Sequence, residues 1–578
     1  MDRRAIWAVA LMMLIALAPS FLLKKPAANR PGSLADSGAA APVAPATSGQ
    51  QRDSVVTPAT GTPAPGAAPD VVTDSAAQAR PPELIEIRSP LYTYVVSTEG
   101  GRIVSATLDE YRSMVPGDSG AAQILREGGI LAPRIVTGGD TVPVDRWVLT
   151  PSAPSLTVGE APASLTLTGG EGGIGIELTY TFTPDYRIGV SGRVSGIGPD
   201  GGLVLVDLGH GLRNTEADSA QNFGAYGLVV KSADGADRTD FRSIDAGETE
   251  LLSGPFEWAA VKSKYFVASV FAFDSAGGDR GRISGVRASA APVQTRFEDA
   301  VQVVATMPVP PSGLVSYAAY VGPLEYDRLH AIGHEFDDVN PYGWPGFRTI
   351  VRFFAVPVRW LLVQMHENLN LAYGVVLVLF GILVRVVLWP LNQKAMRANM
   401  KMQEMQPQLK AAQERYKDNP QQLQVEMFRL YKEYGVNPMS GCWPMLLPMP
   451  VLFALFFVFQ NAIELRGQSF LWLPDLAQKD PYYIIPLVMG ASMYVLSKVG
   501  QAGMEPNPQM KMMLYIMPVM MTVLFVNFAS GLNLYYAVSN IASIPQQWLL
   551  ARERKKRAAR AIVEVKTKKP AGEGRTKR

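Results

Sequence analysis

The sequence is poor in the residues that hold metals, form disulfides or carry redox chemistry. Its single cysteine, Cys442, excludes an internal disulfide, a zinc finger, an iron–sulfur cluster and a dithiol redox pair. It has only four histidines, and the stretch 366–370 begins like a zinc-protease helix but ends in Asn370 instead of the second histidine. No Gly-Lys dipeptide occurs, which excludes a P-loop. We therefore expect no catalytic residues, no metal and no cofactor.

Acidic residues are scarce at the C-terminus, although the whole chain has a net charge of only +3. Residues 551–578 hold twelve lysines and arginines against three glutamates. Such a basic tail suits a polyanion or an acidic lipid surface. An inert solvated tail is the alternative.

Aromatic residues are absent from 26–82, which are rich in Ala, Pro, Ser, Thr and Gly. This composition predicts a disordered linker. The linker follows an uncharged apolar run, 5–23, which lies between two pairs of basic residues. We expect residues 1–25 to be an uncleaved transmembrane anchor; a cleaved signal peptide is the alternative, although the proline in Ala18-Pro19-Ser20 makes a poor cleavage site.

All other apolar runs lie beyond residue 370. They are 371–391, 443–463, 482–499, 512–528 and 532–550. Together with the anchor they predict six transmembrane helices, five of which form a core over 371–550. Several are close to the lower length limit for a span, about 17 residues.

Basic residues predict the orientation of these spans. The segment after the second span and the C-terminal tail are both rich in Lys and Arg, so both are expected in the cytoplasm. An even number of spans then places both termini in the cytoplasm and residues 26–370 outside. We expect a multi-pass membrane protein whose large external domain lies in the periplasm if the cell has two membranes.

The external region is predicted to be an all-β sandwich over 83–325. Five apolar residues alternate with Gly, Glu and Thr in the pattern of a half-buried strand: Ile174, Ile176, Leu178, Tyr180 and Phe182. Glycine pairs separate similar runs. Binding of a sugar or a peptide and a purely scaffolding role both remain open for this domain.

Two further segments are predicted to be helical. Residues 346–367 have Arg348, Arg352 and Arg359 on one face and apolar residues largely opposite, which predicts an amphipathic helix on the outer lipid surface. Pro357 is expected to kink it or to end its first half. Residues 392–436 are polar, and Asn419-Pro420 is a helix-start signal in their middle, so we expect a cytoplasmic helical hairpin.

Arg385 is the residue on which the functional hypothesis rests, because it lies inside the second predicted span. A guanidinium at the bilayer centre costs about 3 kcal/mol on insertion scales. Either snorkelling to the cytoplasmic interface or a water-filled cavity offsets that cost. The other spans favour a cavity, because they contain polar residues but no deep Asp or Glu; the expected groove residues are Arg385, Gln460, Asn461, Asn533, Tyr535, Tyr536 and Asn540.

An unpaired cation in a wet cavity attracts an acidic segment that the protein itself does not supply. Seventeen of the 23 methionines follow residue 390, and flexible thioether side chains suit promiscuous apolar binding. Filling of gaps in a lipid-facing bundle explains the methionines equally well.

Several long motifs resemble the YidC family of membrane-protein insertases. They are LVR at 383–385 with WPL at 389–391, NPMSGCWP at 437–444, DPYYI at 480–484 and SGLNLYYAVSN at 530–540. The resemblance is dense over 346–556 and extends to STEGG at 97–101 in the external region.

The resemblance implies a five-helix core around a hydrophilic groove that is open to cytoplasm and lipid. Arg385 matches the family's groove arginine and Tyr536 a tyrosine that contacts substrate. The external domain is similar to a β-super-sandwich related to sugar-epimerase folds, and the implied partners are nascent membrane proteins, the ribosome, the Sec translocon and the lipid bilayer. Gly381, where relatives often carry a hydroxyl residue, and Pro448, where Gln is common, depart from the pattern.

The expected function is therefore that of an insertase and chaperone, which is not an enzyme. A polar or acidic tail of the guest is hydrated in the groove near Arg385, and its apolar helix then partitions into lipid. A transporter or channel is one alternative, but we find no repeat of broken helices. A membrane-tethered periplasmic carbohydrate enzyme is another, and His210 is the only histidine in its predicted domain.

Overall fold

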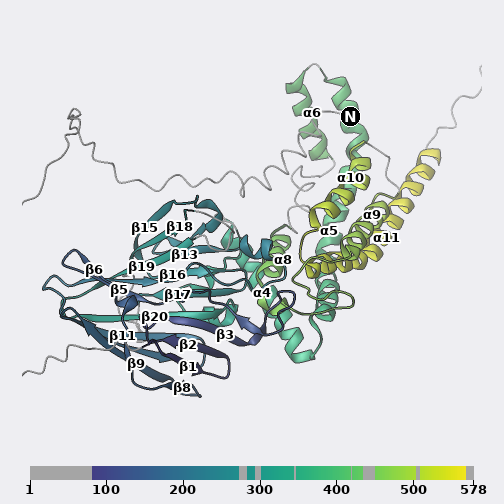
Figure 1. Ribbon diagram of the computed structural model, residues 1–578. Coiled ribbons are helices and arrows are strands. Elements are labelled where there is room, and N and C mark those ends of the chain that lie inside the picture. The colour runs from purple at the N-terminus through teal and green to yellow at the C-terminus, as the bar shows by residue number, and fades with distance from the viewer. Residues whose placement is uncertain are drawn as a thin grey trace, which may run out of the picture. The chain divides into compact units, whose positions relative to one another are not determined.

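The computed structural model describes residues 81–272, 283–292, 301–343, 347–417, 419–433, 449–502 and 508–567 (Figure 1). The contacts divide the chain into Met1–Arg80 and Pro81–Arg578, and all described residues belong to the second unit. The predicted anchor 1–25, almost all of the linker 26–82, the motif at 437–444, Pro448 and the end of the basic tail lie outside the described residues.

The strands between Leu84 and Pro323 form three sheets. The first holds, in spatial order, β4 (Ala121–Gln123), β3 (Ile103–Arg112), β2 (Tyr92–Ser97), β1 (Leu84–Arg88) and β8 (Ser155–Thr157). The second holds β14 (Gly235–Asp240), β13 (Gly227–Ser232), β16 (Trp258–Lys262), β17 (Phe266–Phe271), β20 (Leu314–Pro323), β11 (Arg187–Ser195), β10 (Ile174–Phe182), β9 (Ala163–Glu171) and β7 (Thr150–Pro151). The third holds β15 (Thr249–Phe256), β18 (Ile283–Ala290), β19 (Val301–Val309), β12 (Gly202–Asp207), β5 (Pro133–Thr137) and β6 (Asp140–Val142).

Strand β10 shows why these residues form a sheet. It is the strand predicted from the alternating pattern, and it pairs antiparallel with β9 and β11, with Leu178 opposite Leu167 and Gly192. Leu178, Tyr180 and Phe182 are at most 1% exposed, so one face of the strand is buried throughout. The apolar face of this antiparallel sheet thus contributes to the core of the domain.

Short helices connect or follow the strands. They are η1 (Val144–Arg146), α2 (Ser219–Phe223), η2 (Phe241–Ser243), α3 (Tyr326–Ile332) and η4 (Phe336–Val339). The next helix, α4 (Arg348–Leu369), is the predicted amphipathic helix, and it passes through Pro357 without ending there. Of the two outcomes expected at Pro357, the helix does not end there, and a kink stays a prediction.

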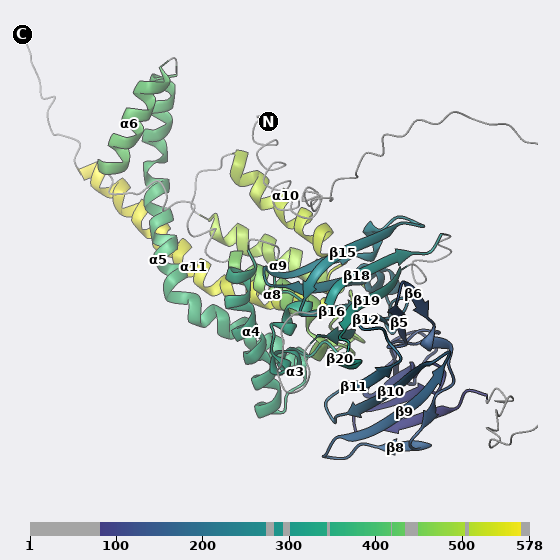
Figure 2. The same cartoon turned by 90° about the vertical axis from the view of Figure 1, so that its left-hand side faces the viewer.

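The helical region begins with α5 (Tyr373–Arg415), a 43-residue helix that continues through Pro390 (Figure 2). The remaining helices are α6 (Pro420–Glu433), α8 (Met449–Asn461), η6 (Ile463–Leu465), α9 (Ile484–Gly500), α10 (Pro508–Phe525) and α11 (Ser530–Thr567). Among the described residues, Tyr373–Pro390 is the one stretch that is long and apolar enough to cross a membrane, judged by length and composition alone. Three shorter apolar helices, Val451–Asn461, Ile484–Gly500 and Met510–Phe525, coincide with predicted spans.

The end of α5 and helix α6 form a helical arm, residues 392–433, in which α6 packs back against α5 (Figure 1). Met405, Ala412 and Leu430 are its buried apolar contacts. The predicted start signal is confirmed, because the Asn419 side chain accepts a hydrogen bond from the Gln422 amide at 3.2 Å.

Candidate functional site

Arg385 lies in Tyr373–Pro390, the stretch of α5 that is long and apolar enough to cross a membrane, twelve residues after the helix begins at Tyr373. At 1.5 Å per residue it is about 18 Å along the helix, past the middle of this apolar stretch. The side chain is half-buried. Its Nε donates a hydrogen bond to Ser539 Oγ of α11 at 2.8 Å. No carboxylate in the described part of the chain forms an ion pair with it.

Tyr535 lies one turn before Ser539 on the same face of α11. It is 4% exposed, and its ring packs near Phe380 of α5 and Phe459 of α8, with centroids 5.7 and 6.4 Å away. Gly381 allows this close approach, because a Cβ there would lie 3.2 Å from Val538 Cγ1 and 3.6 Å from Tyr535 Cδ2. The departure at Gly381 thus coincides with the contact between α5 and α11 beside Arg385.

The other predicted residues of α11 lie on a different face. Positions 533, 536 and 540 recur at helical spacing and are turned about 100° away from 535 and 539. Asn540 Nδ2 donates to Ser492 Oγ of α9 at 3.2 Å, and the Tyr536 ring meets Phe525 of α10 edge-on at 5.4 Å. The predicted groove set therefore divides between the α5 side and the α9–α10 side of α11.

Asn533 is fully buried, and its side chain donates a hydrogen bond to the backbone. Its Nδ2 donates to the carbonyl oxygen of Phe525 at 3.0 Å, which satisfies an acceptor at the end of α10. Its Oδ1 and the hydroxyl of Tyr536 are buried without a protein partner. Two unpartnered polar atoms one turn apart on α11 offer hydrogen bonds to water or to a guest.

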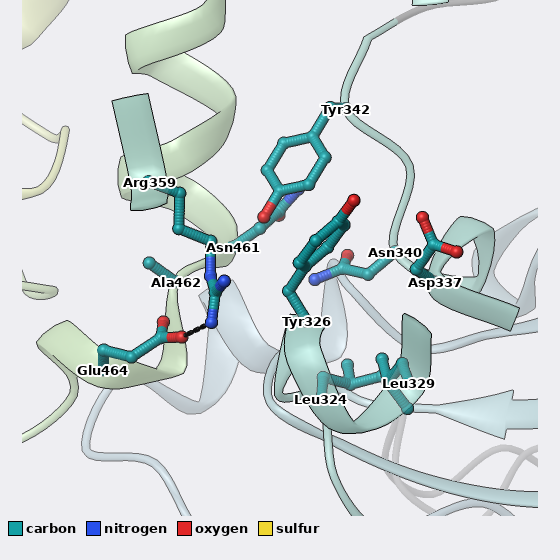
Figure 3. Close-up of a pocket in the computed structure, with 10 residues that line it drawn as sticks. All are labelled: Leu324, Tyr326, Leu329, Asp337, Asn340, Tyr342, Arg359, Asn461, Ala462 and Glu464. Atoms are coloured by element: carbon teal, nitrogen blue, oxygen red, sulfur yellow. Dashed lines mark hydrogen bonds and ion pairs between the residues drawn. The ribbon is translucent and has the colours of Figure 1, made fainter. Parts of the chain in front are cut away.

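Gln460 and Asn461 end helix α8, and the structure separates Asn461 from Arg385. Asn461 lines a small cavity with Arg359 of α4 and Glu464 of η6 (Figure 3). Tyr326 and Tyr342, which follow the last strand, line it too. Gln460 is half-buried. The apolar run 443–463 predicted Asn461 inside a span, but helix α8 ends at this residue. Its amide lies at the junction between the helices and the sheet-containing domain from Leu84 to Pro323, here called the β-domain.

The arginines of α4 also have partners that the sequence did not indicate. Arg348 and Arg352 both contact Asp338 at 3.2 Å, and Arg352 also pairs with Asp337. Burial raises the pKa of Asp338 even though two arginines oppose that shift. The basic face of α4 is thus directed at η4.

The apolar residues of α4 include Ile350, Phe353 and Trp360, which are 50, 72 and 60% exposed. They leave an exposed apolar side on the helix, as an amphipathic pattern predicts, and the position of this side on a lipid surface stays a prediction. Arg348 and Arg352 pair with the carboxylates of η4 and not with lipid headgroups.

One more buried arginine was missed entirely. Arg466 follows η6, and its Nε donates to Glu216 Oε1 at 2.9 Å, with both side chains 2% exposed. The two residues are 250 positions apart, and no local pattern in the sequence could have paired them.

Two families of known proteins match the chain. Residues 84–361 match the YidC periplasmic domain, and residues 364–557 match the 60Kd inner membrane protein family. Together they cover both the β-domain and the helical region.

Similar proteins span most of the chain. The membrane protein insertase YidC of Chlorobium phaeovibrioides is 35% identical over 413 residues, which are 65% of this chain and 66% of that protein. The membrane protein insertase YidC of a Geobacter species is 31% identical over 479 residues, 80% of this chain and 84% of that protein. A crystal structure of an active YidC insertase with its first transmembrane domain resolved is 17% identical, covers 81% of this chain and 93% of that chain, and has a TM-score of 0.32.

Proposed function

The chain belongs to the YidC family of membrane protein insertases, and from this premise we propose that it inserts and folds nascent proteins of the bacterial inner membrane. The observation that carries the proposal is Arg385: a permanent cation, half-buried past the middle of the apolar stretch Tyr373–Pro390, whose hydrogen-bond partner is a neutral hydroxyl. A protein that kept this charge only for stability would be expected to supply a carboxylate.

The proposed reaction is physical transfer without a covalent step or a cofactor. A short polar or acidic tail of the guest enters a hydrated groove lined by Arg385, Tyr535 and Ser539. Tyr536, Asn540 and the free acceptor of Asn533 offer further hydrogen bonds along the α9–α10 side. Hydration of the tail lowers the cost of crossing, and the apolar helix of the guest then partitions into lipid.

The proposed topology has six spans, with both termini in the cytoplasm and the β-domain in the periplasm. The anchor 1–25 is the first span, and the five-helix core occupies 371–550. The helical arm and the basic tail 551–578 then face the ribosome in the cytoplasm, and the Sec translocon is a lateral partner. Helix α4 lies at the outer lipid surface with Ile350, Phe353 and Trp360 toward the acyl chains.

Neither alternative function is favoured. A transporter or channel would need a polar path through both leaflets, whereas the described charges at the outer side, Arg359 with Glu464 and Arg466 with Glu216, are paired with each other. A periplasmic carbohydrate enzyme would need a general acid and base in a pocket, and the family relationship provides no such activity.

Site-specific photo-crosslinking during synthesis of a small membrane protein tests the proposal. Crosslinkers at positions 385 and 536 are expected to capture the nascent chain. Val387 provides a matched control, because it lies on the same helix, two residues away, and is 64% exposed. Equal crosslinking of the nascent chain from positions 385 and 387 would contradict the proposal that a groove at Arg385 binds it.

A chemical test addresses the hydration of the groove. In a Cys442→Ser background the chain has no other thiol, so Arg385→Cys creates a single reporter. We expect a water-borne maleimide added from the cytoplasmic side to modify this cysteine. Protection of the cysteine from the reagent in the folded protein would mean that the site is dry, and the proposal would fail.

A further inference from the structure

The loop between α8 and α9, residues 462–483, carries two opposite charges that bind different parts of the molecule. Glu464 pairs with Arg359 of α4, and Figure 3 shows the two side chains pointing toward each other. Two residues later, Arg466 pairs with Glu216 of the β-domain. The loop is therefore held from two sides by charged side chains.

Arg466 is satisfied almost completely by the β-domain. Its Nε contacts both carboxylate oxygens of Glu216, at 2.9 and 3.1 Å. Its Nη1 donates to the Arg112 carbonyl at 2.8 Å and its Nη2 to the Thr215 carbonyl at 3.1 Å. The guanidinium also lies 5.3 Å from the centre of the Phe266 ring. A buried ion pair adds little net stability over apolar residues of the same shape, but it specifies one geometry through its hydrogen bonds.

A second cation of the β-domain reaches the same loop. Lys264 is 6% exposed, and its Nζ donates to Gln221 Oε1 at 2.8 Å and lies 3.5 Å from the Ala477 carbonyl oxygen. A third contact, Lys479 with Asp218 at 3.8 Å, is exposed, with side chains 46 and 30% accessible. The buried contacts of Arg466 and Lys264 are therefore the ones that define how the loop sits on the β-domain.

The other side of this loop caps helix α11. The Ser530 amide donates to the Gln478 carbonyl at 2.7 Å, and the Gly531 amide donates to the Leu476 carbonyl at 2.9 Å. Ser530 Oγ also donates to the Asp475 carbonyl at 3.2 Å. The first amides of a helix have no partner within the helix, so the loop supplies the acceptors that fix where α11 begins.

We propose that Arg466, with Lys264, is a positioning residue through which the β-domain sets the outer end of α11 and thereby the groove. Ser539 lies nine residues beyond Ser530, about 14 Å along a continuous helix, and it is the hydrogen-bond partner of Arg385. The chain of contacts runs from Glu216 to Arg466, through the loop to Ser530, and along α11 to Ser539. This inference deepens the proposed function and rests on it for the role of Arg385.

Hydrogen exchange in the full-length protein tests the positioning role. We compare Arg466→Met and Glu216→Gln with Lys479→Met, a matched control that removes the exposed contact of the same interface. Arg466→Met and Glu216→Gln are expected to speed exchange of the peptide containing the Ser530 and Gly531 amides by roughly tenfold, because these amides lose fixed acceptors. Lys479→Met is expected to leave exchange of that peptide as in the wild type.

Two readouts separate positioning from loss of the whole fold. Exchange in strand β10 of the β-domain core should stay as in the wild type. A maleimide should modify the Ser539→Cys variant, in a Cys442→Ser background, several-fold faster when Arg466→Met is added. Equal acceleration in β10 and at 530–531 would overturn the proposal, since only global unfolding would then be seen. So would unchanged exchange at 530–531 in both variants.

Glu216→Gln keeps the size and one acceptor of the native side chain, so it answers the question even if Arg466→Met does not fold. An insertion assay with Arg385→Met is run in parallel. If that variant inserts guests normally, the proposed function of the groove fails, whereas the exchange results still report whether Arg466 positions α11.

Discussion

The arginines at the junction between the β-domain and the helices have different partners from Arg385, the arginine of the proposed groove. At the junction Arg359 pairs with Asp327 and Glu464, and Arg466 pairs with Glu216. In the groove Arg385 has the hydroxyl of Ser539 and no carboxylate among the described residues. An arginine is thus neutralised by a carboxylate where it holds the fold together, whereas Arg385 keeps an uncompensated charge where a guest is proposed to bind.

The difference follows from the cost of leaving a buried charge unpaired. Such a charge is tolerated when it is paired, or when water or a ligand solvates it. The junction is closed around its arginines, with Arg359 and Arg466 at most 7% exposed, so each needs a permanent partner. Arg385 is only half-buried, so a transient partner can take that place.

The largest expected effect comes from breaking a junction pair. Arg359→Met leaves Glu464, whose side chain is 19% exposed, without its cation, and should lower the free energy of unfolding by about 3 kcal/mol. Arg429→Met is the matched control, because Arg429 pairs with Glu426 and Glu433 on the exposed surface of α6 and its loss should have no measurable effect. Thermal unfolding in detergent measures both, and equal shifts would remove the distinction between buried and exposed pairs.

The next effect comes from giving Arg385 the partner that the junction arginines have. Ser539→Asp puts a carboxylate where Arg385 donates its hydrogen bond, so the cation is neutralised from within. Insertion of a guest with an acidic tail should fall about tenfold, equivalent to about 1.4 kcal/mol. Protease protection in proteoliposomes measures insertion. Ser539→Asn controls for size, and a similar loss with Asn would show that charge is not the cause.

The pH dependence of stability sharpens the comparison at the junction. Burial lowers the pKa of Lys264 to about 8, from an ordinary value of 10.5. Above pH 8 the unfolded chain keeps a proton that the folded chain has lost, so the free energy of unfolding should rise with pH, by up to about 1.4 kcal/mol per unit. Thermal unfolding between pH 7.5 and 9.5 should show this rise in the wild type and in Lys479→Gln. It should be missing in Lys264→Gln; an unchanged slope there would assign the effect to another group.

The smallest effect is expected one turn before Arg385. Gly381→Ser adds a hydroxyl at the contact with α11, where a Cβ would lie 3.2 Å from Val538 Cγ1, and should change stability by about 0.5 kcal/mol. Insertion should change less than about twofold, because a neutral hydroxyl leaves the charge of Arg385 in place. Gly381→Ala separates the added carbon from the hydroxyl. A large loss with Ser but not with Ala would show that even a neutral partner occupies the guest's place.

Local patterns in the sequence predicted the local parts of this structure. Alternation predicted strand β10, the Asn419-Pro420 pair predicted the start of α6, and apolar runs beyond residue 370 coincide with α5, α8, α9, α10 and α11. Arg385 was identified because a charge inside an apolar run is conspicuous without any tertiary information. Its half-buried position and its neutral partner were then supplied by the fold.

Contacts between segments that are far apart in the chain could not be predicted from the sequence. Nothing near Arg466 indicates Glu216, and the arginine face of α4 does not reveal that η4 carries its carboxylates. The expected groove residues were predicted as one group, whereas Asn533 of α11 donates to a carbonyl at the end of α10 and Asn461 of α8 lines the cavity at the junction. Helical spacing gives the angle between such residues but not which neighbour lies at each angle.

Helix α5 carries Arg385 and forms part of the helical arm, and its proline has a mechanical consequence. Pro390 has no amide hydrogen for the carbonyl of Val386, so the helix bends most easily just beyond Arg385. A bend at that point would change the direction of the helical arm without displacing Arg385, although one unbroken helix connects the two.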